Sequence, residues 1–182
     1  MKVSLRNVLI TALLLFSAGC SQYQEKLLQE YGGTYVGDNG NVSQILSRLP
    51  GADSSLSLEL TDQIITVNYH HNQIDGEPSE WLETGESMGK MFMFNAIYLS
   101  ILVPNANGFV FHVEEYSFSI TKSEIENVLT EQLGPLLNEE EKWDPVKVEQ
   151  FISEKKEAII DMIDSNEFRE SFFAEFPITI ED

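Results

Sequence analysis

The chain has 182 residues, of which 42% are hydrophobic, and its 30 acidic and 11 basic side chains give a formal net charge of −19. This hydrophobic content excludes wholesale disorder, and the length suits one domain with extensions. We expect no nucleic-acid partner, because duplex binding requires clustered lysine and arginine and the sequence has no basic cluster.

The first twenty residues, MKVSLRNVLITALLLFSAGC, have the pattern of a secretion signal. Two basic residues precede an apolar run, residues 8–16, that is shorter than the ~20 residues a membrane-spanning helix needs. Small residues then lead to Cys20, the only cysteine of the chain. The segment resembles the lipobox of bacterial lipoproteins, whose cysteine is acylated and becomes the new N-terminus, although Ser17 stands where leucine is usual. An ordinary signal with a chance cysteine is the alternative.

Residues 1–19 are therefore expected to be a lipoprotein signal peptide, and residues 20–30 the lipidated Cys20 followed by a polar tether. Two acyl chains on one residue anchor a protein stably in a membrane. We expect the mature chain to lie at the extracytoplasmic face of the cell membrane, bound to it through the lipid on Cys20.

The stretch TYVGDNGN, residues 34–41, is rich in residue types that favour turns. The next apolar residues recur with helical spacing as far as Leu49, and Pro50 then ends the predicted helix. We expect Asn41 to be its N-cap, with Gln44 bonding back to it.

The same stretch has a second interpretation as a binding site. Asp38, Asn39 and Asn41 offer hard oxygen ligands, although their spacing is not that of a calcium loop. We favour a turn with a helix cap, and keep these three residues as tentative binding residues for a partner or a weakly held cation.

Two strands are predicted next, at residues 56–60 and 64–69, because polar and apolar residues alternate in both. The three residues between them suit a hairpin. After a polar loop at residues 70–80, residues 88–103 are apolar on almost every side. This run predicts a central helix that is covered on most sides.

Residues 108–121 form the next predicted strand region, which a bend near Glu115 divides into two strands. Thr121 and Glu124 form a capping box at the start of a helix, and Gly134 provides its end. This helix has the clearest boundaries in the sequence.

The C-terminal part predicts a longer helix that Asp144 caps and Pro145 begins, with an apolar stripe as far as Ile163. The stripe either packs on its own domain, which we favour, or binds a partner helix. A second apolar patch, SFFAEF at residues 171–176, precedes a short final strand at residues 178–180.

Together these elements predict an α+β fold: a small antiparallel sheet of two strand pairs packed on a central apolar helix, with additional helices. We assign residues 31–134 to this α+β domain and residues 135–182 to a helical C-terminal extension.

Three segments carry a resemblance to a known family: YVGDNGNVSQILSRLP, ITVNY and FNAIYLSILVPNANGFVFHVEEYSFSITKSEIENVL. Over roughly residues 31–133 the chain resembles the domain-of-unknown-function 4825 family, found in lipoproteins of Gram-positive bacteria and appended to some membrane metallopeptidases that resemble the beta-lactam receptor. The resemblance implies a location and a domain class, and it brings no catalytic residues with it.

The residues offer little catalytic chemistry. His70 and His112 are weak metal candidates on the polar faces of their strands, while the adjacent His71 points to the opposite face from His70. Paired carboxylates are uninformative in a chain this acidic. We expect no catalytic residue and no cofactor.

These observations favour a non-enzymatic, lipid-anchored binding or regulatory module, with a membrane or envelope protein as a possible partner. The alternative is a cell-envelope hydrolase that uses carboxylates or a histidine-bound metal.

Overall fold

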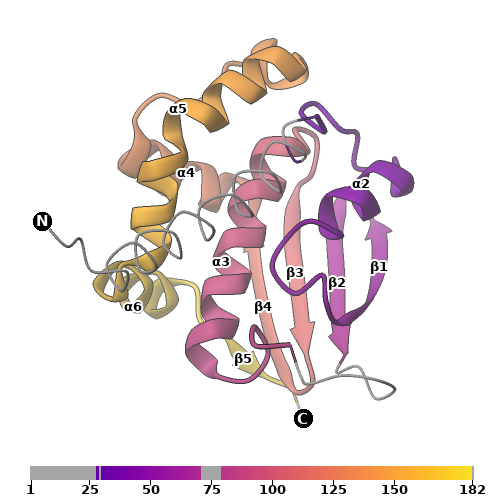
Figure 1. The fold of residues 1–182 in the computed structure, drawn as a ribbon, viewed down its shortest axis with the longest axis vertical. Helices are drawn as coiled ribbons and strands as arrows, with labels where there is room; N and C mark the ends of the chain where they lie inside the picture. Colours follow the sequence, from indigo (N-terminus) through magenta and orange to yellow (C-terminus); the bar gives the residue numbers. More distant parts are fainter. Residues whose placement is uncertain (1–27, 29, 71–78, 182) are drawn as a thin grey trace, which may run out of the picture.

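The computed structural model describes residues 28, 30–70 and 79–181 of the chain. Within them, helices cover one face of a five-stranded sheet whose strand order is β1-β2-β3-β4-β5 (Figure 1). The elements in chain order are α2 (Asn39–Leu46), β1 (Ser55–Thr61), β2 (Ile64–His70), α3 (Gly85–Leu102), β3 (Gly108–Val113), β4 (Tyr116–Thr121), α4 (Lys122–Leu133), the 3₁₀ turn η1 (Glu141–Trp143), α5 (Pro145–Asp164), α6 (Asn166–Glu175) and β5 (Thr179–Ile180).

The α+β class is confirmed, and the two predicted strand pairs are present as antiparallel hairpins, β1–β2 and β3–β4. They join through a parallel pairing of β2 with β3, in which Ile64 lies opposite Gly108. The sheet is therefore mixed, whereas a wholly antiparallel sheet was expected. The reason is α3, which carries the chain back along the sheet so that β3 starts beside the start of β2.

The β1–β2 turn consists of two residues, Asp62 and Gln63, both with positive φ (54° and 62°). This backbone conformation matches the right-handed twist of the flanking strands. The side chain of Asn107 supports the turn: its Nδ2 donates to the Asp62 carbonyl at 3.3 Å and to Gln63 Oε1 at 2.9 Å. The hairpin was predicted correctly, with its loop one residue shorter than expected because Thr61 belongs to β1.

The predicted central apolar helix is α3, which runs along the strands on one face of the sheet, with α5 on its other side (Figure 1). It begins at Gly85, three residues earlier than expected, because Thr84 and Ser87 form a capping box ahead of it. The ring of Phe92 stacks on those of Phe111 and Phe118, at centroid distances of 5.8 and 5.7 Å. This aromatic contact joins α3 to the middle of the sheet.

Helix α2 differs from the prediction at its start. Its N-cap is Asp38, and the expectation of Asn41 as N-cap was wrong. The two carboxylate oxygens of Asp38 accept from the backbone N and the side-chain Nδ2 of Asn41, each at 3.0 Å. A carboxylate at this position also interacts favourably with the positive end of the helix dipole, an advantage that the Asn41 side chain does not have.

The C-terminal residues pack on the same core as the rest. The predicted starts of α4 at Thr121 and of α5 at Asp144 are confirmed. The apolar face of α5 packs on its own protein, with Val148, Ile152 and Ile159 fully buried.

Helix α5 ends at Asp164, and Ser165 both ends it and caps a further helix, α6. The sequence did not separate the two helices, because only one non-helical residue lies between them. Phe172 of α6 is buried against Phe118, and the short strand β5 pairs with β4.

Candidate functional site

The tentative binding residues Asp38, Asn39 and Asn41 lie together at the exposed start of α2. Asp38 and Asn41 bond to each other, and Asn39 Oδ1 accepts from the Ser43 hydroxyl at 3.1 Å. These polar groups hold the helix start in place, which agrees with the favoured interpretation as a turn with a cap.

A buried polar contact occupies the centre of the region that carries the family resemblance. Asn95 is fully buried on α3, and its Nδ2 donates to the Tyr69 hydroxyl at 2.8 Å and to the Pro50 carbonyl at 3.0 Å. Burial raises the pKa of Tyr69, so that its hydroxyl stays neutral. At Gly51, where φ is +88°, a Cβ would lie 2.7 Å from the sulfur of Met91. The hydrogen bonds of Asn95 thus join the chain after α2 to α3 and β2, and their role is structural.

The two candidate histidines are on the open face of the sheet. His112 lies opposite Asn68 in the β2–β3 register, and His70 is two residues further along β2. His112 Nδ1 is 3.6 Å from Glu181 Oε2. Over residues 28, 30–70 and 79–181 no three histidine, cysteine or carboxylate side chains gather as a metal site would need. His71 and Cys20 lie outside the described residues.

The most distinctive exposed feature is a pair of aromatic rings that the sequence did not predict. Tyr35, in the loop before α2, is 62% exposed, and it packs on Trp143 at the end of η1. The ring centroids are 4.9 Å apart and the rings are tilted by 33°. Val146, in the first turn of α5, is 68% exposed. We call Tyr35, Trp143 and Val146 the Tyr35–Trp143 surface.

The backbone on both sides of Tyr35 is held in place. The N–H of Thr34 donates to the Leu102 carbonyl at 2.9 Å, and the N–H of Val36 donates to Asn105 Oδ1 at 2.9 Å. Gly33, at φ +76°, lies so close to η1 that a Cβ there would be 2.8 Å from the Trp143 carbonyl oxygen. The exposed position of the Tyr35 ring is therefore fixed by the fold.

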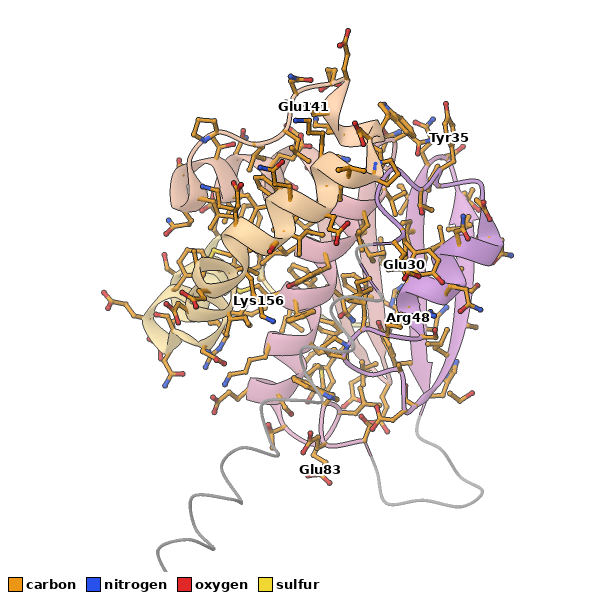
Figure 2. All side chains as sticks on the ribbon, turned by 45° about the horizontal axis from the view of Figure 1, so that its top comes forward. Glu30, Tyr35, Arg48, Glu83, Glu141 and Lys156 are labelled. Carbon is orange, nitrogen blue, oxygen red and sulfur yellow. The ribbon has the colours of Figure 1, made fainter. Side chains whose placement is uncertain are left out.

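Several exposed carboxylates are close neighbours of these rings along the chain. Asp38, Glu140 and Asp144 are exposed close to them in the chain, and Figure 2 shows Tyr35 and Glu141 at the same end of the molecule. The basic Lys142 is only 17% exposed, because its Nζ binds Glu126 at 3.1 Å and Glu139 at 2.9 Å. The surface thus has an apolar centre and an acidic rim.

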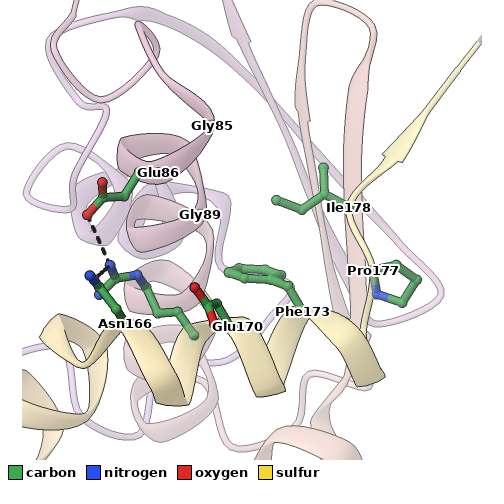
Figure 3. A pocket seen from close by; sticks show the side chains of 9 residues that line it. Gly85, Glu86, Gly89, Asn166, Glu170, Phe173, Pro177 and Ile178 are labelled. Atoms are coloured by element: carbon green, nitrogen blue, oxygen red, sulfur yellow. Dashed lines mark hydrogen bonds and ion pairs between the residues drawn. The ribbon is translucent and has the colours of Figure 1, made fainter.

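A second feature is a hollow of about 540 Å³ between the start of α3 and α6 (Figure 3). Arg169 lies against it and is only 6% exposed. Its guanidinium donates to the Ile163 carbonyl at 2.6 Å, to Glu86 Oε1 at 3.0 Å and to the side-chain oxygen of Asn166. Because Arg169 is bound by groups from α5, α6 and α3, it holds these helices together, and its charge is already paired with that of Glu86.

The fold defines the class of protein: an α+β domain whose buried polar residues serve the fold and whose aromatic residues Tyr35 and Trp143 pack on each other at the surface. A family model for a domain of unknown function, DUF4825, matches residues 28–122, and the chain belongs to this family. The match contains Tyr35 and ends before Trp143, so the Tyr35–Trp143 surface combines a residue of the family region with residues beyond it. No curated protein and no solved structure matches the chain.

No helix in the described part of the chain combines the length and the apolar character that crossing a bilayer requires.

Proposed function

We propose that the protein is a non-enzymatic binding or regulatory module, held by the lipid on Cys20 at the extracytoplasmic face of a bacterial cell membrane. The Tyr35–Trp143 surface binds its partner, a membrane or envelope protein. The observation that carries this proposal is the exposed pair of aromatic rings, which pack on each other and whose Tyr35 member lies in a loop held by backbone hydrogen bonds.

Large aromatic side chains are among the residues that contribute most to protein–protein interfaces. Most of the surface of Tyr35 stays open to solvent although its ring packs on Trp143. Since its loop is held by hydrogen bonds on both sides, binding would cost little conformational entropy.

The rim indicates the chemistry of the partner. Carboxylates around an apolar centre are complementary to an apolar pocket flanked by lysine or arginine, and charge complementarity of this kind raises association rates. The formal net charge of −19 also attracts a basic partner, and it does so over longer distances.

The proposed location rests on the N-terminal sequence, in which a short apolar run and small residues precede the single cysteine. The alternative of an envelope hydrolase gains no support from the arrangement of the described residues. Residues 85–89, GESMG, match the GxSxG pattern, but Ser87 belongs to the capping box of α3, where its hydroxyl contacts that of Thr84 at 2.9 Å.

The experiment is photo-cross-linking in cells with benzoylphenylalanine in place of Tyr35. The matched control carries the same probe at Ile180, which is 68% exposed on β5. We expect position 35 to give one dominant adduct, with a membrane or envelope protein, that position 180 does not give. Equal labelling from both positions would contradict the proposal.

A charge-reversal variant tests the rim in the same assay. Glu140→Lys should weaken the adduct formed at position 35, because it places a cation opposite the basic residues expected in the partner. Glu131→Lys, an exposed site on α4, makes the same change of charge away from η1 and should leave the adduct unchanged.

A further inference from the structure

A cleft of about 360 Å³ lies between the chain that follows α2 and helix α5. Its wall contains Trp81, Phe94 and Tyr98, and Leu28, Arg48 and Lys156 also line it. Figure 2 shows Arg48 and Lys156 on the same side of the molecule, on different elements. We call this site the Arg48–Lys156 cleft.

The wall of the cleft is apolar, and two of its aromatic rings pack on each other. Phe94 and Tyr98 are one helical turn apart on α3, and their rings stack at a centroid distance of 4.4 Å. Ile160 of α5, which also lines the cleft, is 37% exposed. An aromatic and aliphatic wall of this kind suits an occupant with apolar side chains.

Charged groups stand at the edge of this wall. Arg48 Nη1 donates to the Gln44 carbonyl at 2.6 Å, and the guanidinium lies 5.0 Å from the centre of the Tyr31 ring. Lys156 and Asp53 line the same cleft. In a chain with only 11 basic residues, two of them beside one apolar cleft favour an occupant that includes a carboxylate.

The chain itself leads to this cleft. Leu28 is 2% exposed and lines it, and the N–H of Tyr31 donates to the Leu28 carbonyl at 3.0 Å. Residues 21–27, SQYQEKL, are joined directly to Leu28. Seven residues reach from about 10 Å as a helix to about 23 Å when extended, which is enough to cross a cleft of this size.

We propose that residues 21–27 bind in the Arg48–Lys156 cleft of their own chain. The segment has the matching chemistry: Tyr23 and Leu27 are apolar, Glu25 is complementary to the two cations, and Lys26 is complementary to Asp53. Because the segment is tethered beside the cleft, its effective concentration there is on the order of millimolar or more, so that weak contacts suffice.

Binding of this segment has a consequence for the anchored protein. Cys20, the proposed site of the lipid, directly precedes residues 21–27. A segment bound in the cleft fixes the direction from which the lipid leaves the domain, and hence the orientation of the Tyr35–Trp143 surface above the membrane. The binding itself does not depend on the proposed partner, so the two proposals can fail separately.

The experiment uses the mature chain, residues 20–182, without lipid, with a nitroxide on its single thiol at Cys20. The paramagnetic broadening of the two indole N–H signals is measured by NMR. Trp81 lies in the cleft, and Trp143, on the Tyr35–Trp143 surface, is the internal reference. We expect Trp81 to be broadened strongly and Trp143 weakly.

Charge variants decide whether the cleft causes this broadening. Lys156→Glu should abolish the excess broadening of Trp81, and adding Glu25→Lys to that variant should restore it. Lys147→Glu, an exposed site on α5 that does not line the cleft, is the matched control and should change nothing. Unchanged broadening in Lys156→Glu, or no restoration in the double variant, would overturn the proposal.

One further measurement separates binding in cis from binding in trans. A nitroxide-labelled chain without ¹⁵N is mixed with an unlabelled ¹⁵N chain. Broadening of Trp81 in this mixture would show that the segment of a second copy occupies the cleft, and would overturn the proposal. An unbroadened Trp81 signal in the mixture supports binding within one chain.

Discussion

At alkaline pH, the free energy of unfolding should change with pH because one buried lysine titrates. Lys122, at the start of α4, is 7% exposed, and its Nζ donates to the carbonyls of Val103 and Pro104 at 3.1 and 2.7 Å. These carbonyls directly follow α3, so the ammonium group of Lys122 caps the C-terminal end of that helix. Burial lowers the pKa of Lys122 from 10.5 to about 8, and the carboxylate of Glu126, 3.9 Å away, opposes this effect.

The sign of the pH dependence follows from the two pKa values. Between pH 8 and 10.5 the unfolded chain holds a proton on Lys122 more firmly than the folded chain does. The free energy of unfolding therefore rises with pH in this interval. Below pH 8, Lys122 is protonated in both states and adds no pH dependence. At ~1.4 kcal/mol for each pKa unit, the full interval corresponds to about 3 kcal/mol.

The assay compares urea unfolding of the wild type and Lys122→Met at several pH values from 7.5 to 10. We expect the stability of the wild type relative to the variant to rise by about 2 to 3 kcal/mol over this range. Tyr69, whose raised pKa makes the fold lose stability above pH 10, is present in both chains and cancels in the difference. A flat difference would refute the reasoning, and would mean that the two carbonyls and Glu126 offset the effect of burial.

Three further substitutions test the interior. Asn95→Ala should lower the free energy of unfolding by about 1–3 kcal/mol in urea titrations, because the Tyr69 hydroxyl and a carbonyl lose their donor; an effect below 0.5 kcal/mol, roughly the scatter among surface substitutions, would contradict this role. Gly51→Ala should lower the melting temperature, whereas Gly37→Ala, with no atom within 4 Å of its new Cβ, should not. Arg169→Met should speed amide exchange in α6 first, and uniform acceleration across the protein would argue against a local clamp.

The local elements could be predicted from the sequence because short-range signals determine them. Thr121 and Glu124 lie three residues apart, and their capping box appears in the structure as expected. The β1–β2 hairpin follows in the same way from alternating residues on either side of a short turn. Helix α6 was missed for a local reason as well, since the single residue Ser165 separates it from α5.

The arrangement of the elements depends on contacts between distant residues, which the sequence pattern does not encode. Nothing in the strands themselves shows that β2 and β3 pair in parallel, because α3 determines where β3 begins. The Tyr35–Trp143 contact joins residues more than a hundred positions apart. Tyr35 belongs to a motif that the sequence did single out, but its exposure became visible only with the fold.

Strand β5 has a consequence for how the protein is made. Its two residues pair with Tyr116 and Ser117 of β4, and the N–H of Glu181 donates to the Glu115 carbonyl at 2.8 Å. During synthesis, which proceeds from the N-terminus, this edge of the sheet stays open until residues 179–181 have been made. An open strand edge is a template for pairing with other chains. Loss of residues 179–181 should therefore appear first as self-association during biogenesis, before any change in the core.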